Sequence, residues 1–185
     1  MCRRQSQGFT LIELVVVIII ISGLLYFAFE HLLKLEVQAE RASMQQVIGN
    51  LNSAIAMVIS KHIADDNIPG LRSYIDSNPM DLLAQTPPTY LGSFPGQPPQ
   101  LGKGVHWYFD QSTHSLVYVT GSPTYFVSDG PEKSVTRLKI LPVYDDNNAN
   151  RQFAALAGLR LAATAPYHWH NQPINPADDA HPATP

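Results

Sequence analysis

The sequence is poor in cysteine, in charge and in catalytic motifs. It contains one cysteine, Cys2, among 185 residues, and a single thiol cannot close a disulfide within the chain. Charged residues make up 15% of the composition and the formal net charge is −3, which argues against non-specific binding to nucleic acid, because such proteins present basic surfaces. The chain contains neither a Gly-x-Ser-x-Gly turn nor a glycine-rich phosphate-binding loop. These absences favour a protein without enzymatic activity.

One long apolar run dominates the N-terminal part of the chain. It covers the 21 residues of the range 9–29, in which Glu13 is the only charged residue. A helix of about 20 apolar residues is what crosses the core of a bilayer. Arg3 and Arg4 precede the run, so the short N-terminal flank is expected to stay in the cytoplasm and the rest of the chain to lie across the membrane.

Glu13 is the feature of this run that requires an explanation. An ionised carboxylate in the middle of a membrane span costs about 2.5–3.5 kcal/mol on insertion scales, and the sequence offers no partner on the same helix face. A free α-amino group could neutralise it, but only if the chain is cut just before the apolar run. A secretory signal cut later, near Ser22 and Gly23, would leave the charge without a use inside its apolar core.

The residues from Gly8 to Glu13, Gly-Phe-Thr-Leu-Ile-Glu, resemble the processing site of type IV prepilins and of type II secretion pseudopilins. The resemblance implies cleavage by a prepilin peptidase after Gly8, N-methylation of the new terminal Phe9, and a place for Glu13 as the fifth residue of the mature chain. In that family the glutamate is thought to meet the terminal amine of a neighbouring subunit during assembly.

This resemblance also implies a function and a location. The chain would be a structural subunit of a type IV pilus or of a type II secretion pseudopilus, with other subunits, the inner membrane and the assembly platform as partners. Its C-terminal domain would lie in the periplasm. Loss of the leader, residues 1–8, would remove Cys2 and lower the net charge to −5. A mature chain without cysteine lacks the disulfide-closed loop of many major pilins, which favours a minor pilin or a pseudopilin.

Residues 30–63 are predicted to continue the helix, because they contain no proline and Gly49 is their only glycine. Apolar residues recur there at three- and four-residue spacing, which predicts one buried stripe. The stripe consists of Leu33, Val37, Met44, Ile48, Leu51, Ile55 and Val58. The polar residues that fall mostly off it are Glu36, Glu40, Arg41, Gln45, Asn52 and Lys61. We expect one helix from Phe9 to about Ile63 whose second half packs on a sheet, although a free amphipathic or coiled-coil segment has the same spacing.

Residues 64–170 are predicted to form an α+β domain, in which an antiparallel sheet packs on the long helix, as in pilins. Short helices are expected at 71–75 and after Asn78-Pro79, followed by a connection rich in proline and glycine as far as Gly104. Runs of β-branched and aromatic residues predict the strands. They lie at 105–109, 115–119, 125–127, 135–144 and 159–161, with Pro142 at an edge or a strand end.

Two segments near the end of the chain have other properties. Residues 171–185 are rich in proline and are expected to be a disordered tail. Asp145, Asp146 and Asn147 begin an oxygen-rich loop that could gather a calcium ion. The loop lacks the glycine and the distal glutamate of familiar calcium loops, and such clusters are more often plain turns.

Histidines and aromatic residues suggest two alternative functions. His168 and His170 would point to the same side of an extended segment, as two ligands of zinc or copper could, with His106 or His181 as a third. Without a fixed third ligand they are expected to be surface residues. A membrane-tethered binding module that does not polymerise could use aromatic rings to contact a ligand, although the same rings are expected to build the core against the long helix. Those rings are Trp107, Tyr108 and Tyr118.

Overall fold

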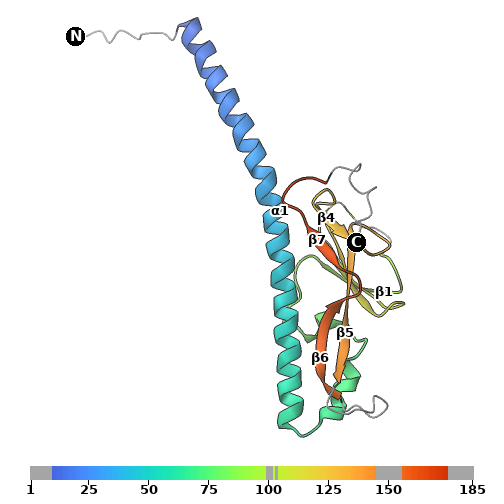
Figure 1. Ribbon diagram of the computed structural model, residues 1–185. Helices are drawn as coiled ribbons and strands as arrows, with labels where there is room; N and C mark the ends of the chain where they lie inside the picture. Colours follow the sequence, from blue (N-terminus) through green and yellow to red (C-terminus); the bar gives the residue numbers. More distant parts are fainter. Residues whose placement is uncertain (1–9, 99–101, 103, 145–155, 175–185) are drawn as a thin grey trace, which may run out of the picture. The chain divides into compact units, whose positions relative to one another are not determined.

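The structure, a computed structural model, describes residues 10–98, 102, 104–144 and 156–174 (Figure 1). Its contacts divide the chain into two units, one that ends at Ala39 and one that begins at Glu40. A single helix, α1 (Leu11–Ala64), contributes residues to both units. The long helix predicted from the sequence is therefore confirmed over the described residues.

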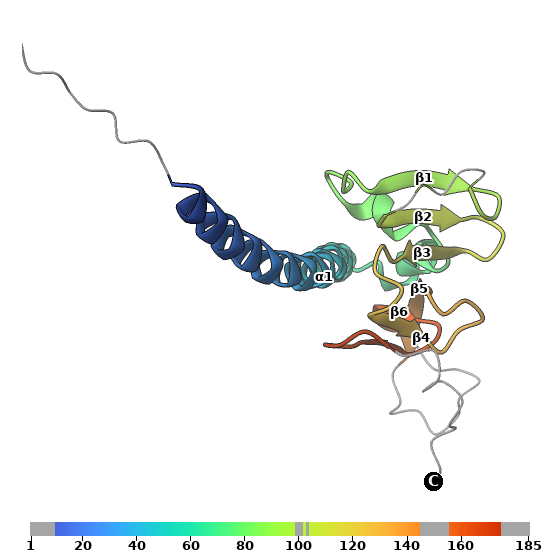
Figure 2. The same ribbon diagram turned by 90° about the horizontal axis from the view of Figure 1, so that it is seen from above.

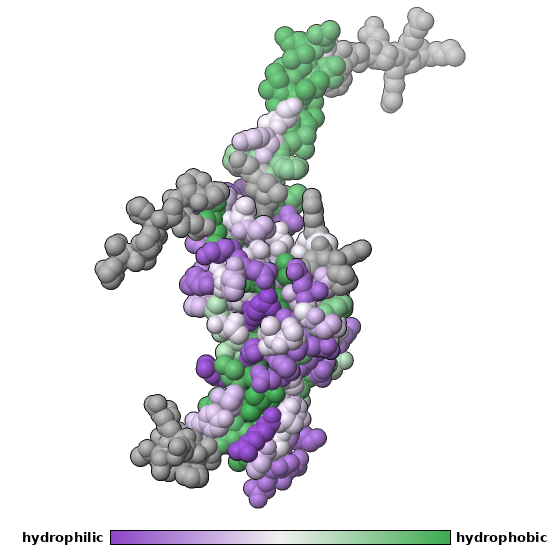
Figure 3. Space-filling view, turned by 90° about the vertical axis from the view of Figure 1, so that its right-hand side faces the viewer, coloured by the Kyte–Doolittle hydropathy of each residue, from purple (hydrophilic) through white to green (hydrophobic). Residues whose placement is uncertain are grey.

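In the first unit, α1 exposes its apolar side chains. All described side chains from Thr10 to Phe29 are exposed, and this part of the helix is coloured as hydrophobic in Figure 3. Among the described residues, α1 is the one helix that is long and apolar enough to cross a membrane. Soluble proteins rarely leave so large an apolar surface in water, so this surface requires lipid or another protein chain to cover it.

The chain leaves α1 through a tight turn and two short 3-10 helices, η1 (Ile68–Tyr74) and η2 (Pro79–Leu82). A Cβ atom at Gly70 would come within 2.8 Å of the side-chain nitrogen of Asn67 and 2.9 Å of the ring of His62, so a larger residue there would have to displace these side chains. Asn78 begins η2, and its side-chain oxygen accepts a hydrogen bond from the backbone N–H of Met80 at 3.1 Å. Both predicted short helices are present, and the first starts three residues earlier than expected.

The second unit contains a five-stranded sheet with the order β1-β2-β3-β5-β6. In chain order its strands are β1 (Tyr90–Phe94), β2 (His106–Asp110), β3 (Ser115–Val119), β5 (Val135–Tyr144) and β6 (Leu156–Ala163). The predicted hairpin is confirmed as β2 and β3, which lie side by side in Figure 2. Leu138 is the last residue of β5 that pairs with β3. Pro142 lies beyond this point and therefore pairs with β6 alone. This agrees with the edge position expected for that proline.

The sheet is mostly antiparallel, as predicted, but it is a mixed sheet, because its edge strand β1 was not predicted. Strand β1 runs parallel to β2, and its register shifts between Tyr90 and Ser93. This stretch was predicted to belong to a connection rich in proline and glycine. Gly92 lies inside the shift with a φ of +106°, a conformation that glycine adopts without strain. Such a bulge is common at sheet edges, and it hides the alternation by which strands are recognised.

A second, two-stranded sheet was also missed. It pairs β4 (Phe126–Ser128) with β7 (Tyr167–Trp169) in antiparallel orientation. The first of these strands was predicted within one residue, whereas the second was considered only as a possible extended segment. The pairing of two such short strands is not visible in their own sequences, because it depends on the packing of Phe126 against Trp169, whose ring centroids lie 5.0 Å apart.

The core of the second unit lies between α1 and the five-stranded sheet. Met44, Val47 and Leu51 are buried against Trp107 and Tyr118. Side chains alternate along each strand, and a separate cluster on the opposite face contains Tyr108, Val117 and Val135. The helix-on-sheet packing predicted from the sequence is thus confirmed.

Candidate functional site

Thr10 and Glu13 form the start of α1. The backbone N–H of Glu13 donates a hydrogen bond to the hydroxyl of Thr10 at 3.3 Å, which is half of the reciprocal arrangement called a capping box. Glu13 therefore lies in the first turn of the helix, where the unpaired N–H groups and the helix dipole favour a negative charge. This geometry gives the carboxylate a local stabilising environment in addition to the partner amine expected from the sequence.

The residues of the predicted processing site are only partly described. Gly8 and Phe9 lie outside the described residues, so cleavage between them and methylation of Phe9 stay predictions. The side chain of Glu13 is exposed and stands on a helix surface that is exposed throughout its apolar length. Of the residues that the structure describes in the first unit, none covers it, so a group from another molecule could reach it.

Glu40 is buried, and the prediction that it falls off the stripe was wrong. Its side chain is 8% exposed. Its Oε1 atom accepts hydrogen bonds from the hydroxyls of Tyr118 and Thr120 at 2.8 and 2.6 Å and from the N–H of Gly121 at 2.9 Å. Burial raises the pKa of Tyr118, and the hydrogen bond to Glu40 raises it further, so the phenol remains a donor.

The sequence did contain a signal for this position. Glu40 precedes Met44 by four residues, and Met44 precedes Val47 by three, so all three lie on one helix face. Val47, which the predicted stripe omitted, is 7% exposed. Spacing alone does not predict the burial of Glu40, because carboxylates are rarely buried without a partner.

The aromatic rings of the hairpin are not a ligand surface. Trp107, Tyr108 and Tyr118 are 1%, 3% and 0% exposed, respectively. Trp107 and Tyr118 pack under α1, whereas Tyr108 packs on the opposite face, where its ring meets Phe94 at a centroid distance of 6.5 Å. The expectation that these rings build the core against the long helix is confirmed for Trp107 and Tyr118 and is wrong for Tyr108. All three rings are buried, so they do not offer the exposed contact that a binding module would use.

The histidine and calcium hypotheses gain no support. His168 and His170 are exposed, and the part of the chain that the structure describes contains no group of three or more His, Cys, Asp or Glu side chains that could hold a metal ion, His106 included. His181 and the loop residues 145–147 lie outside the described residues. The calcium site therefore stays a prediction.

Asp110 organises the loop between β2 and β3. Its Oδ1 accepts hydrogen bonds from the N–H and the hydroxyl of Ser112 at 2.9 and 2.6 Å, and its Oδ2 accepts one from the hydroxyl of Thr113 at 2.8 Å. Arg137 lies 3.4 Å from Oδ2 and also pairs with Glu132 at 3.0 Å. Burial by itself would raise the pKa of Asp110, but the hydrogen bonds from Ser112 and Thr113 outweigh it and lower that pKa. The ionised carboxylate therefore stabilises the loop between β2 and β3.

Asp110→Asn is expected to lower the stability of the second unit at neutral pH and to have a smaller effect in acid. Because the pKa of Asp110 in the folded protein lies below its unfolded value of about 3.9, its contribution is present above that value and is lost as the pH falls through the folded pKa. Denaturation followed by tryptophan fluorescence at pH values from roughly 7 to 2 measures the difference. Asp129→Asn, at an exposed position, is the control. A difference that stays constant into strong acid would contradict this account.

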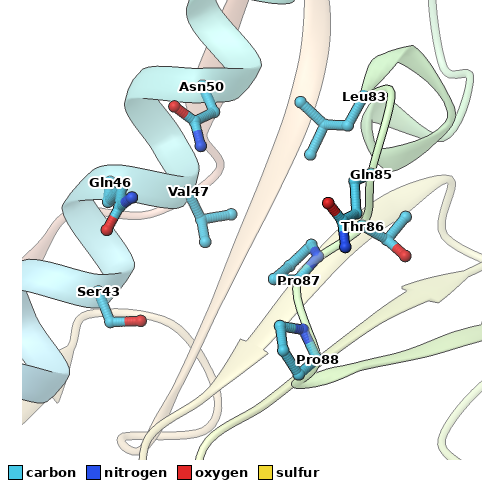
Figure 4. A pocket seen from close by; sticks show the side chains of 9 residues that line it. All are labelled: Ser43, Gln46, Val47, Asn50, Leu83, Gln85, Thr86, Pro87 and Pro88. Atoms are coloured by element: carbon cyan, nitrogen blue, oxygen red, sulfur yellow. The ribbon is translucent and has the colours of Figure 1, made fainter.

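A cavity of about 370 Å³ lies along α1 within the second unit. Ser43, Gln46, Val47 and Asn50 of α1 face the segment 83–88 across it (Figure 4). Its volume is in the range of ligand sites, but its lining side chains are uncharged and none titrates near neutral pH. This cavity therefore offers no acid, base or charged nucleophile.

The architecture defines a class of protein. A long helix with an exposed apolar N-terminal part, followed by a mixed sheet that is mostly antiparallel, is the α+β fold of pilin-like proteins. Residues 3–22 match the family model of the prokaryotic N-terminal methylation motif. The chain thus carries the signature of type IV pilin-like prepilins, precursors that a prepilin peptidase processes. Comparisons with curated proteins and with solved structures gave no match.

Proposed function

We propose that the chain is a minor pilin or a pseudopilin, a non-enzymatic structural subunit of a type IV pilus or of a type II secretion pseudopilus. The observation that carries this proposal is the match to the methylation motif at residues 3–22, which contains Glu13 at the start of an exposed apolar helix. In this proposal α1 anchors the precursor in the bacterial inner membrane, with the second unit in the periplasm. After processing, the same helix surface packs against other subunits.

The exposed apolar surface of α1 supports both stages. A side chain that contacts lipid before assembly and protein after it keeps its apolar environment, so transfer out of the membrane does not place the surface in water. Glu13 is the exception, because its charge is poorly solvated in either environment. Pairing with the α-amino group of a neighbouring copy would neutralise it and would favour one axial alignment of the two helices.

Incubation of the purified precursor with a prepilin peptidase is expected to remove residues 1–8, and cells are expected to yield a terminal Phe9 that carries a methyl group. Intact-mass spectrometry measures both changes. Gly8→Trp should block cleavage by filling the site with a bulky side chain, and Gln7→Ala, one residue away, should not. A wild-type precursor that keeps its N-terminus under these conditions would remove the basis of the proposal.

Co-purification with sheared filaments separates this function from the alternative, a tethered binding module that does not polymerise. The alternative depended on exposed aromatic rings in the hairpin, and those rings are buried. We therefore retain the structural subunit as the single proposed function. Recovery of the mature chain only in the membrane fraction, in cells that assemble filaments, would reverse this choice.

A further inference from the structure

The row of α1 side chains that faces the sheet in the second unit contains one carboxylate and otherwise apolar groups. Its fully buried members are Glu40, Met44, Val47, Leu51 and Ile55. The three- and four-residue steps between them are those of a regular amphipathic helix. Because this pattern repeats at each helical turn, apolar side chains could face the sheet in more than one axial alignment of α1.

Sliding α1 along the sheet by four residues would keep all four apolar places apolar. The places of Met44, Val47, Leu51 and Ile55 would be taken by Ile48, Leu51, Ile55 and Ile59. The slide amounts to about 6 Å at 1.5 Å per residue, and unwinding the last turn of α1 can span it, because an extended chain rises about 3.3 Å per residue. Apolar burial at these four places therefore distinguishes the two alignments poorly, whereas the half-buried places of Ile48 and Val58 would be taken by Asn52 and His62.

The place of Glu40 does distinguish them. After the slide it would be occupied by Met44, whose side chain cannot accept the three hydrogen bonds that Glu40 receives. The donors of Tyr118 and Thr120 are buried, and a buried donor without an acceptor is unfavourable. Glu40 itself would move to the place of Glu36, which is exposed. The cost in free energy of the shifted alignment therefore comes from the unpaired donors on the sheet and not from Glu40.

We propose that Glu40 fixes the axial alignment of α1 on the sheet. A single buried polar residue has this role in coiled coils, where it selects one register among several that apolar contacts allow. The proposal concerns the folded second unit and does not depend on assembly. If the chain does assemble, the alignment also decides which surfaces of the second unit meet neighbouring copies.

Distances between spin labels in the full chain, in detergent micelles, test the proposal. Cys2→Ser removes the only native cysteine. Labels are placed at Gln45 and Gln111 in one sample and at Asn52 and Gln111 in another, all at exposed positions. The wild type is expected to give one distance for each pair, and Glu40→Met a second component displaced by up to about 6 Å.

Two further variants separate the causes. Glu40→Gln retains a side-chain oxygen that can accept the same bonds and should give the wild-type distances, as should Glu36→Met, the matched change at an exposed carboxylate one turn earlier. If Glu40→Met does not fold, the double variant Tyr118→Phe, Thr120→Val removes two donors from the sheet and should give the second component. Single, unshifted distances in folded Glu40→Met, or in the double variant if Glu40→Met does not fold, would overturn the proposal. Because the labels report on isolated copies, this outcome is independent of whether filaments form.

Discussion

Glu13→Ala is expected to reduce incorporation into filaments at least about tenfold while leaving folding and peptidase cleavage intact. The physical reason is the low dielectric of the helix surroundings, in which two opposite charges at hydrogen-bond distance attract by several kcal/mol more than in water. A loss of about 1.4 kcal/mol already corresponds to a factor of ten in an equilibrium constant. Sheared filaments quantified by immunoblotting, with processing checked by mass spectrometry, measure the effect.

The capping geometry of Glu13 provides a second explanation that this experiment must separate. The carboxylate lies in the first turn of α1, and its own N–H is bonded to the hydroxyl of Thr10. Thr10→Ala removes this cap and keeps the charge, so its incorporation should stay near that of the wild type. Glu13→Gln keeps the polar side chain and removes the charge, so it should be impaired like Glu13→Ala. Equal losses in Thr10→Ala and Glu13→Ala would assign the residue to helix capping instead.

Much of the fold could be predicted because its elements are long and periodic. The apolar run and the stripe around Met44 and Leu51 predicted a helix that ends one residue from its actual end at Ala64. The runs His106–Asp110 and Ser115–Val119 predicted the hairpin, since each contains three consecutive β-branched or aromatic residues. In these segments local preference and tertiary packing favour the same structure.

The features that were missed depend on contacts between distant residues. Strand β1 contains a glycine bulge, and its parallel partner begins twelve residues after it ends. The burial of Glu40 depends on Tyr118 and Thr120, about eighty positions away in the chain. A carboxylate is normally exposed unless it is paired, and the sequence does not show which residues pair with Glu40. Short strands such as β7 are fixed by packing rather than by their own pattern.

The partners of Glu40 lead to the second large expected effect. Glu40→Ala should lower the free energy of unfolding by about 3–5 kcal/mol, because three donors lose their common acceptor at about 1–3 kcal/mol for each buried one, and a gap remains beside them. This is a large part of the 5–15 kcal/mol typical of a folded domain. Denaturation followed by the fluorescence of Trp107, which packs on Tyr118 at a centroid distance of 4.7 Å, reports directly on this region.

A double-mutant cycle shows whether the loss arises from the hydrogen bonds. Tyr118→Phe removes one donor and keeps the ring, so combining it with Glu40→Ala should cost less than the sum of the two single changes, with a coupling of about 1 kcal/mol or more. Glu36→Ala, at an exposed carboxylate on the same helix, should leave the unfolding curve unchanged. Purely additive effects at Glu40 and Tyr118 would mean that the buried carboxylate stabilises the unit by packing alone. In that case a methionine of similar length would replace it without loss, and the three hydrogen bonds would contribute little to the preference of α1 for its place on the sheet.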